Sequence, residues 1–297
     1  MMGKRVRSRK LGGWTQTAVV LLIALALVLT GCATTGVNKG DINLISVDQE
    51  VQMGRDFAAE IAKTYPLLKD PEINAYFQKL GEKLARASDW PDLQYHFQVV
   101  NTADVNAFAI PGGWVYIHRG LIERADNLSE VACVMGHEIG HVVARHGTEL
   151  MTKQYGIALV TQLILGQNPK MWEKIAAQLF TTAGVLHYSR KHELEADRLG
   201  VRYAYKAGFN PNGMVTFFEK LQALQKREPS LIEVWFSTHP PTSERIKQAK
   251  AQIARLSLGP NLITDEPSFH QIQKKLKALP PVKTLGEIEK NRKGKKG

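Results

Sequence analysis

The stretch MGHEIGHVVARH, residues 135–146, places two histidines four positions apart, with a glutamate directly after the first. In a helix, side chains four residues apart project from one face, so His137 and His141 can point at the same cation. Glu138 then lies beside that cation without binding it, as in zinc hydrolases whose carboxylate takes a proton from water. Apolar residues flank the pair on both sides and predict a buried helix, and buried histidines need partners.

A catalytic zinc needs a third protein ligand, and this helix does not supply one. His146 is one position off the register of a third histidine, and on a continuous helix it points elsewhere, so we expect it to be structural or on the surface. SRKHELEADRLG, residues 189–200, offers carboxylates on a second predicted helix. Glu193 and Asp197 share one face of that helix, whereas Glu195 points roughly 160° away. We therefore expect Glu193 to be the third ligand and Asp197 to orient a ligating histidine.

The N-terminus has the parts of a bacterial secretion signal. Five basic residues precede the apolar run AVVLLIALALVL, which closes with LTGC, Leu29 to Cys32. The run is shorter than the about 20 apolar residues of a spanning helix. An apolar residue, two small residues and Cys are typical of a lipoprotein signal, so we expect cleavage before Cys32 and lipid on it; an uncleaved anchor helix is the alternative. Ala33, in place of Asp, favours the outer membrane, with the chain facing the periplasm.

Composition argues against two classes of protein. The formal charge is +11, but removal of residues 1–31 reduces 39 basic residues to 34 against 28 acidic ones, a charge of +6. No basic stripe is interleaved with aromatic residues, so we expect no nucleic-acid partner. The chain has two cysteines, and with lipid on Cys32 the other, Cys133, has no partner for a disulfide. Cys133 lies four residues before His137, but we expect a small buried side chain there and not a ligand.

The rest of the chain predicts a mostly helical α+β domain with one small sheet. Ser46 with Gln49, and Asn127 with Glu130, are capping boxes, and Asp70-Pro71 also starts a helix. The segment 156–166 is very apolar and is a core helix by default, with a lid or membrane-facing segment as the alternative. Helices are expected at 46–64, 70–87, 127–155, 170–186, 190–207, 211–227 and 242–257, and strands at 95–100 and around a Pro-Gly-Gly turn within 106–120.

These elements suggest four parts of the chain. Residues 1–31 are the expected signal peptide and residues 32–45 a flexible tether. Residues 46–258 form the expected metal-binding domain. Residues 259–297 are a C-terminal extension, basic and disordered at its end, with disorder expected from residue 279.

Four motifs together resemble one known family. HEIGH, SRKHELEAD, NAFAIPGG and STHPPTSERI (237–246) look like the HtpX-like and CAAX-prenyl-endopeptidase-like zinc metallopeptidases of the gluzincin type. The resemblance covers roughly residues 45–250 and implies a zincin-type metallopeptidase domain with an active-site helix. The layout resembles the periplasmic lipoprotein members of the family. We expect the tetratricopeptide domain that some of them carry to be absent.

The resemblance implies roles for particular residues around one zinc ion. Glu138 would be the general base, and His239 and Arg245 would also serve catalysis. His239 is expected at the mouth of the site, where it either occupies zinc's fourth position at rest or donates to the oxyanion. The implied zinc ligands are His137, His141 and Glu193, and the implied substrate edge strand is Asn106, Ala107, Phe108 and Ala109.

The expected function is a lipid-anchored zinc endopeptidase that hydrolyses misfolded or mistargeted proteins of the cell envelope, as protein quality control. Unfolded envelope proteins would be its substrates, and the lipid on Cys32 its contact with the membrane. Two alternatives remain open: an amidase acting on cell-wall peptide, and a chaperone or assembly factor with little proteolysis. The intact Glu138 favours an enzyme, because a protein that only binds clients needs no general base.

Overall fold

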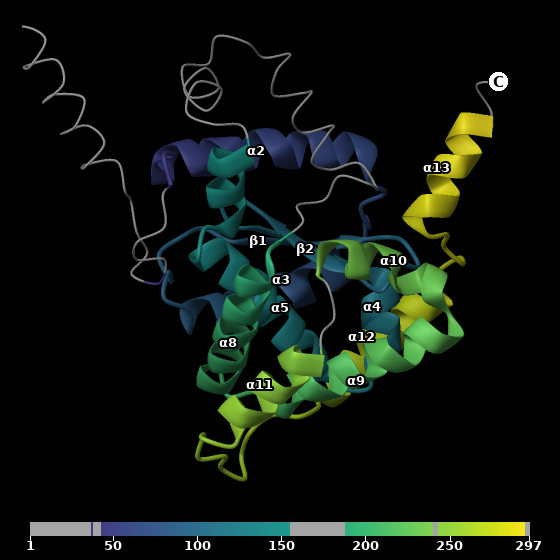
Figure 1. Cartoon of the computed structure of the whole chain (residues 1–297). Coiled ribbons are helices and arrows are strands. Elements are labelled where there is room, and N and C mark those ends of the chain that lie inside the picture. Colours follow the sequence, from purple (N-terminus) through teal and green to yellow (C-terminus); the bar gives the residue numbers. More distant parts are fainter. Residues whose placement is uncertain (1–36, 38–42, 155–187, 240–242, 295–297) are drawn as a thin grey trace, which may run out of the picture.

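The computed structural model describes residues 37, 43–154, 188–239 and 243–294 (Figure 1). Cys32, the expected signal peptide and the expected helices at 156–166 and 170–186 lie outside these residues. No helix within the described ranges has both the length and the apolar character needed to cross a membrane.

The described chain is mostly helical with one small sheet, which confirms the predicted fold class. The helices are α2 (Val47–Thr64), α3 (Pro71–Arg86), α4 (Arg119–Arg124), α5 (Leu128–Val143), α8 (Arg190–Lys206), α9 (Asn212–Arg227), α10 (Pro229–Thr238), α11 (Ser243–Ile253), α12 (Pro267–Ala278) and α13 (Leu285–Gly294). The strands are β1 (His96–Val100), β2 (Ala107–Ile110) and β3 (Trp114–His118). The predicted capping box of α2 is present, with Ser46 and Gln49 each bonded to the other's backbone nitrogen.

The three strands lie in the order β1-β3-β2, with β1 parallel and β2 antiparallel to β3. Gly112 and Gly113 of the Pro-Gly-Gly turn both have positive φ, which is why the chain reverses there between β2 and β3. Side-chain amides of α3 cover the outer edge of β1. Gln78 accepts a hydrogen bond from the backbone of Phe97 and donates one to the carbonyl of Tyr95.

Helices cover both faces of the sheet. Alternate residues of a strand point to opposite faces, and the two faces pack into different hydrophobic clusters. Phe108 and Tyr116 pack in the cluster that contains Phe57 of α2. Ala109 and Val115 pack in the larger cluster with α3 and α5. Figure 1 shows α2 on one side of the sheet and α5 with α8 on the other.

The prediction of one continuous helix from 127 to 155 is wrong. α5 ends at Val143, and Arg145 has a φ of 56°, a left-handed conformation that is uncommon for a side chain other than glycine. Helical residues resume at 146 and continue to 154. Residues far away in the sequence hold Arg145 in this conformation. Its Nε lies 2.5 Å from a Glu50 carboxylate oxygen, and its Nη2 donates to the carbonyl of Ile45 at 2.5 Å.

The C-terminal part is more ordered than the sequence suggests. α12 was not predicted, and residues 285–294 form α13 where we expected disorder from residue 279. The backbone nitrogen of Leu285 donates to the buried carboxylate of Asp104, 181 positions earlier, which anchors the start of α13. α4 and α10 are further helices that the sequence did not predict, and α11 is shorter than the expected 242–257.

Candidate metal centre

Two glycines let α5 and α8 approach closely enough to share a site. A Cβ atom on Gly200 of α8 would lie 2.7 Å from the backbone nitrogen of His137 in α5. A Cβ atom on Gly136 would lie 3.0 Å from the carbonyl oxygen of Gly200. Because both positions lack a side chain, the backbones pack directly and Glu193 comes within reach of the α5 histidines.

Four side chains converge at this contact. His137, His141, Glu193 and His239 each offer one ligand atom, and these atoms all lie within 4.8 Å of one another. Nε2 of His141 is 3.1 Å from Nε2 of His137 and 3.4 Å from a Glu193 oxygen. None of the four residues is more than 2% exposed. The structure therefore brings together the two histidines of α5 and the glutamate of α8 that the sequence singled out.

The donor set fits a zinc ion. Imidazole nitrogens and one carboxylate are ligands that zinc binds in four-coordinate sites. Glu138 adds a second observation, since both of its oxygens are buried without a hydrogen-bond partner among the described residues. An ionised carboxylate is costly to bury without a partner, and burial accordingly raises the pKa of Glu138. A cation with its water in the cluster would supply the missing partner.

Asp197 and Arg245 hold the side chains of the cluster in position. Nδ1 of His137 lies 2.8 Å from Oδ1 of Asp197. Arg245 donates to both oxygens of Asp197 at 2.7 Å and lies 2.8 Å from Glu193. Arg245 thus binds two carboxylates of α8 at once. Asp197 has the position that we predicted for an outer partner of a ligating histidine.

Charge within the site sets the protonation of its carboxylates. Burial disfavours ionisation of Glu193, but the charges of His239 and Arg245 outweigh it and hold its pKa well below the usual range. Burial also opposes ionisation of Asp197, and Arg245 again lowers its pKa. Burial lowers the pKa of His141 well below its usual value, so its ring stays neutral. Ionised carboxylates and neutral imidazoles are the forms that bind metal ions.

His239 lies inside the cluster and follows the last residue of α10. Its Nδ1 is 2.9 Å from Oε1 of Glu193 and 3.3 Å from Nε2 of His137. Its Nε2 lies 3.6 Å from Glu138. Burial disfavours the charged ring, but the carboxylates of Glu193 and Glu138 outweigh burial and raise its pKa.

Three further residues at the cluster were not found from the sequence. Tyr188 stacks on the His141 ring, with centroids 3.9 Å apart, and Trp235 lies 4.8 Å from the His239 ring. No spacing signal marks either aromatic residue. We expected His146 to be structural or on the surface and to point away from the site. The surface alternative and the direction are wrong: the ring is fully buried, and its Nδ1 lies 2.9 Å from Nδ1 of His141. The break at Arg145 turns this histidine back toward α5.

The expected substrate edge is partly enclosed. Ala107, Phe108 and Ala109 lie in β2, which pairs only with β3 among the described strands. All three are at most 7% exposed, and the preceding Asn106 is 1% exposed with its side-chain oxygen lacking a hydrogen bond. Among the described strands, this edge of β2 thus has no partner strand, but it is buried.

Cys133 is a buried free thiol, as expected, and its sulfur faces backbone carbonyls instead of the cluster.

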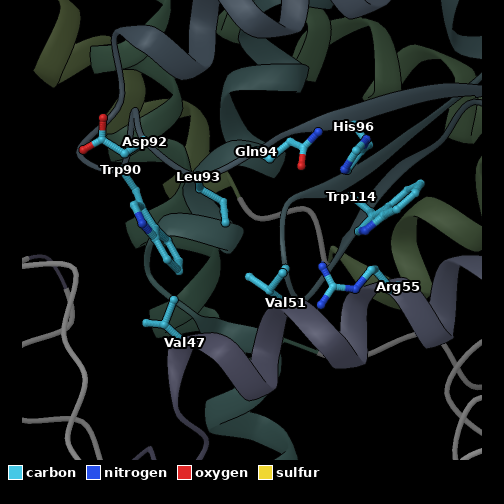
Figure 2. A pocket seen from close by; sticks show the side chains of 10 residues that line it. Val47, Val51, Arg55, Trp90, Asp92, Leu93, Gln94, His96 and Trp114 are labelled. Carbon is cyan, nitrogen blue, oxygen red and sulfur yellow. The ribbon is translucent and has the colours of Figure 1, made fainter.

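An open pocket of about 420 Å³ lies elsewhere on the molecule (Figure 2). α2 contributes Val47, Val51 and Arg55 to it, while His96 and Trp114 come from the starts of β1 and β3. None of the metal-centre residues lines this pocket.

Several known proteins are similar to this chain in sequence. Residues 71–253 match Peptidase family M48. The chain is 31% identical over 238 residues to the beta-barrel assembly-enhancing protease of Yersinia pestis, covering 77% of this chain and 49% of that protein. Identity to the protein of the same name in Escherichia coli (strain K12) is 34% over 217 residues, covering 69% and 44%. Metalloprotease YcaL of Escherichia coli (strain K12) is 28% identical over 252 residues, covering 80% and 98%. The chain spans about half the length of the first two relatives.

Proposed function

The chain belongs to Peptidase family M48 and is a zinc-dependent metallopeptidase, and from this premise we propose that it is a lipid-anchored endopeptidase of the bacterial cell envelope. In this proposal it hydrolyses peptide bonds of misfolded or mistargeted envelope proteins. The observation that carries the proposal is the buried cluster of four ligand atoms within 4.8 Å, with the carboxylate of Glu138 beside it and free of hydrogen bonds among the described residues.

His137, His141 and Glu193 are the proposed ligands of one zinc ion. Zinc, when bound, supplies Lewis-acid polarisation of a peptide carbonyl and makes water a better nucleophile at neutral pH. Asp197 holds His137 by its Nδ1, and Arg245 holds both Asp197 and Glu193 in place. These contacts fix the ligands before the metal arrives, so less ordering is needed when it binds.

Glu138 is the proposed general base. Both of its oxygens are free of hydrogen bonds in the described structure and lie next to the cluster. Burial raises its pKa, which brings a carboxylate closer to the range where it exchanges protons at neutral pH. Glu138 would take the proton from the attacking water and pass it to the leaving amine.

His239 is the proposed occupant of the fourth position in a resting state. Its Nδ1 lies close to an oxygen of Glu193 and to Nε2 of His137. Both distances are shorter than the distance between Nε2 of His137 and the other oxygen of Glu193. The His239 ring is 1% exposed and lies among the ligand atoms, so in this proposal it moves aside to make room for a substrate carbonyl. His239 directly precedes the Pro240-Pro241 pair, which lies outside the described residues.

The envelope assignment rests on the chain's relatives and on its N-terminus. Two relatives are named as proteases that enhance beta-barrel assembly, and such barrels belong to outer membranes. The LTGC junction at Leu29 to Cys32 supports a lipid anchor on Cys32. We propose residues 1–31 as a removed signal, 32–45 as a tether and 46–258 as the peptidase domain, followed by the basic extension 259–297.

The proposed activity is tested by measuring bound zinc and casein cleavage for the wild-type chain and Glu138→Gln. The variant is expected to keep its zinc and to lose casein cleavage, because only the proton-accepting carboxylate is removed. A variant that cuts casein as fast as wild type would contradict the role of Glu138. Zinc binding without casein cleavage by either protein would favour the chaperone alternative.

Mass spectrometry of the mature N-terminus tests the proposed lipid anchor. A mature N-terminus other than acylated Cys32 contradicts it.

A further inference from the structure

His146 and His141 contact each other through the same ring nitrogen. The two Nδ1 atoms lie 2.9 Å apart, and the rings are nearly perpendicular with centroids 5.0 Å apart. Both side chains are buried, at 0% and 2% exposure. A hydrogen bond between two nitrogens needs one proton and one lone pair, so one ring donates and the other accepts.

The surroundings of His141 decide which ring donates. Its Nε2 faces the other ligand atoms, 3.1 Å from Nε2 of His137 and 3.4 Å from Glu193. A neutral imidazole that offers the lone pair of Nε2 to a metal ion carries its proton on Nδ1. In the metal-binding tautomer, His141 is therefore the donor, and Nδ1 of His146 is the acceptor.

We propose that His146 is a positioning residue of the metal centre, which accepts the Nδ1 proton of His141 and so fixes its ring for metal binding. The inference rests on the proposed function, because it assigns His141 as a ligand. With Nδ1 accepting, neutral His146 carries its own proton on Nε2. That nitrogen lies 3.5 Å from a Glu195 oxygen, so the proton faces a carboxylate.

The ring of His146 is itself held on several sides. His192 stacks on it with centroids 4.4 Å apart and an angle of 23° between the planes. His192 is fixed in turn by Glu149, whose carboxylate lies 3.3 Å from its Nε2. The backbone turn before His146 is held by the buried ion pair of Arg145 with Glu50. A ring that is fixed this way can orient a second ring.

The two α5 histidines thus have different outer partners. His137 faces a carboxylate directly, with its Nδ1 2.8 Å from Asp197. His141 reaches the carboxylate of Glu195 only through the ring of His146. A ligating histidine usually donates its second N–H to such a partner, and removal of the partner typically weakens metal binding 10–100-fold.

The test compares zinc dissociation constants of purified full-length variants, measured by competition with a chelator. His146→Leu removes the acceptor, whereas His146→Asn places an amide oxygen near the position of Nδ1. His118→Leu is the matched control, because His118 is also a fully buried histidine but bonds Thr102 and not the cluster. Thermal unfolding of the metal-free proteins reports any purely structural loss. If His146→Leu does not fold, His146→Gln replaces it, since its amide extends to the Nε2 position.

We expect wild type to bind one zinc, His146→Leu to bind it about 10–100-fold more weakly, and His146→Asn to recover most of that loss. His118→Leu should lower the unfolding temperature without changing zinc affinity. The inference is overturned if His146→Leu weakens zinc binding by less than about threefold, or if His146→Asn binds no better than His146→Leu. Wild type without zinc affinity would overturn the proposed function itself, a result distinct from a normal affinity in the His146 variants.

Discussion

Arg245 and Asp197 form a buried, bidentate ion pair. Two nitrogens of the guanidinium lie 2.7 Å from the two carboxylate oxygens, and the residues are 2% and 3% exposed. The third nitrogen lies 2.8 Å from Glu193, a proposed ligand. One arginine therefore pairs with two carboxylates that α8 brings into the core, and their charges also raise the arginine's own pKa against the effect of burial.

Arg245→Met is expected to lower the free energy of unfolding of the metal-free protein by about 3–5 kcal/mol, because it removes the buried guanidinium from Asp197 and leaves His239 as the neighbouring positive charge of Glu193. Added zinc should restore part of this loss, since the cation lies beside Glu193. Urea unfolding with chelator and with zinc measures both effects. Arg190→Met is the control: this arginine pairs with Glu244 at the surface, with its side chain 65% exposed, and its loss should cost less than about 1 kcal/mol. Equal effects of the two variants would argue against a structural role for the buried pair.

Gly200→Ala is expected to separate α5 from α8. The added Cβ would lie 2.7 Å from the backbone nitrogen of His137, a contact that neither helix backbone can relieve without moving. Overpacking of this kind costs about 1–3 kcal/mol, and zinc affinity should fall as well, because Glu193 moves away with its helix. Thermal unfolding and chelator competition measure the two losses. Gly259→Ala, where nothing lies within 4 Å, should change neither; a harmless Gly200→Ala would refute the close-packing argument.

Glu193→Gln is expected to lose most of the bound zinc and to melt at a lower temperature in the presence of zinc, because metal binding is coupled to folding. Glu195→Gln, two residues along the same helix, should keep most of its zinc, since its carboxylate meets the cluster only through His146. Metal content by atomic absorption separates the variants. The reverse pattern, with zinc lost only from Glu195→Gln, would show that the assignment of helix faces is wrong.

The sequence predicted the parts of the site that depend on local spacing. His137, His141 and Glu193 follow from helical periodicity, and the helix of the two histidines begins at the cap that the sequence predicted, Asn127 at the start of α5. The break at Arg145 could not be predicted in this way. The left-handed residue is an arginine and not a glycine, and its stabilising partners lie 95 and 100 positions earlier in the chain.

The consequence of that break was equally hidden from the sequence. His146 contacts His141 only because the helix stops, so an argument from a continuous helix placed it outside the site. α13 is a similar case, since the amide of Leu285 is bound by Asp104 across 181 positions. Contacts between residues this far apart leave no periodic pattern in the sequence. The spacing of the ligands within each helix does leave such a pattern, because it spans only a few turns.

Acid is expected to destabilise the metal-free fold through His118. Burial lowers the pKa of this fully buried histidine to about 3, with Thr102 bonded to its Nδ1 and the carboxylate of Asp104 3.8 Å away. Because the folded-state pKa is lower than the ordinary value near 6.5, the unfolded chain takes up the proton first. The stability that this residue contributes is present above about pH 6.5 and declines by about 1.4 kcal/mol per pH unit as pH falls toward 3.

The measurement is urea unfolding at pH 7 and pH 5 with chelator present, for wild type and His118→Asn. The variant lacks the titrating ring. Between pH 7 and pH 5 its free energy of unfolding should therefore fall by about 2 kcal/mol less than that of wild type. An identical fall in both proteins would mean that His118 is protonated in the folded state.

His239→Ala is expected to raise basal proteolysis. Nδ1 of His239 lies among the ligand atoms, 2.9 Å from Glu193 and 3.3 Å from Nε2 of His137, so the side chain occupies the place that a substrate carbonyl needs. Three proposed ligands remain in the variant, which should therefore keep its zinc. Casein cleavage per bound zinc measures the effect, with Trp235→Phe as the control, because it changes the ring packed against His239 but leaves the imidazole. The competing role predicts the opposite sign: a donor to the oxyanion, once removed, would lower turnover by a factor on the order of 100. A fall of that size would therefore replace the blocking role with a catalytic one, and unchanged cleavage would leave His239 a structural residue.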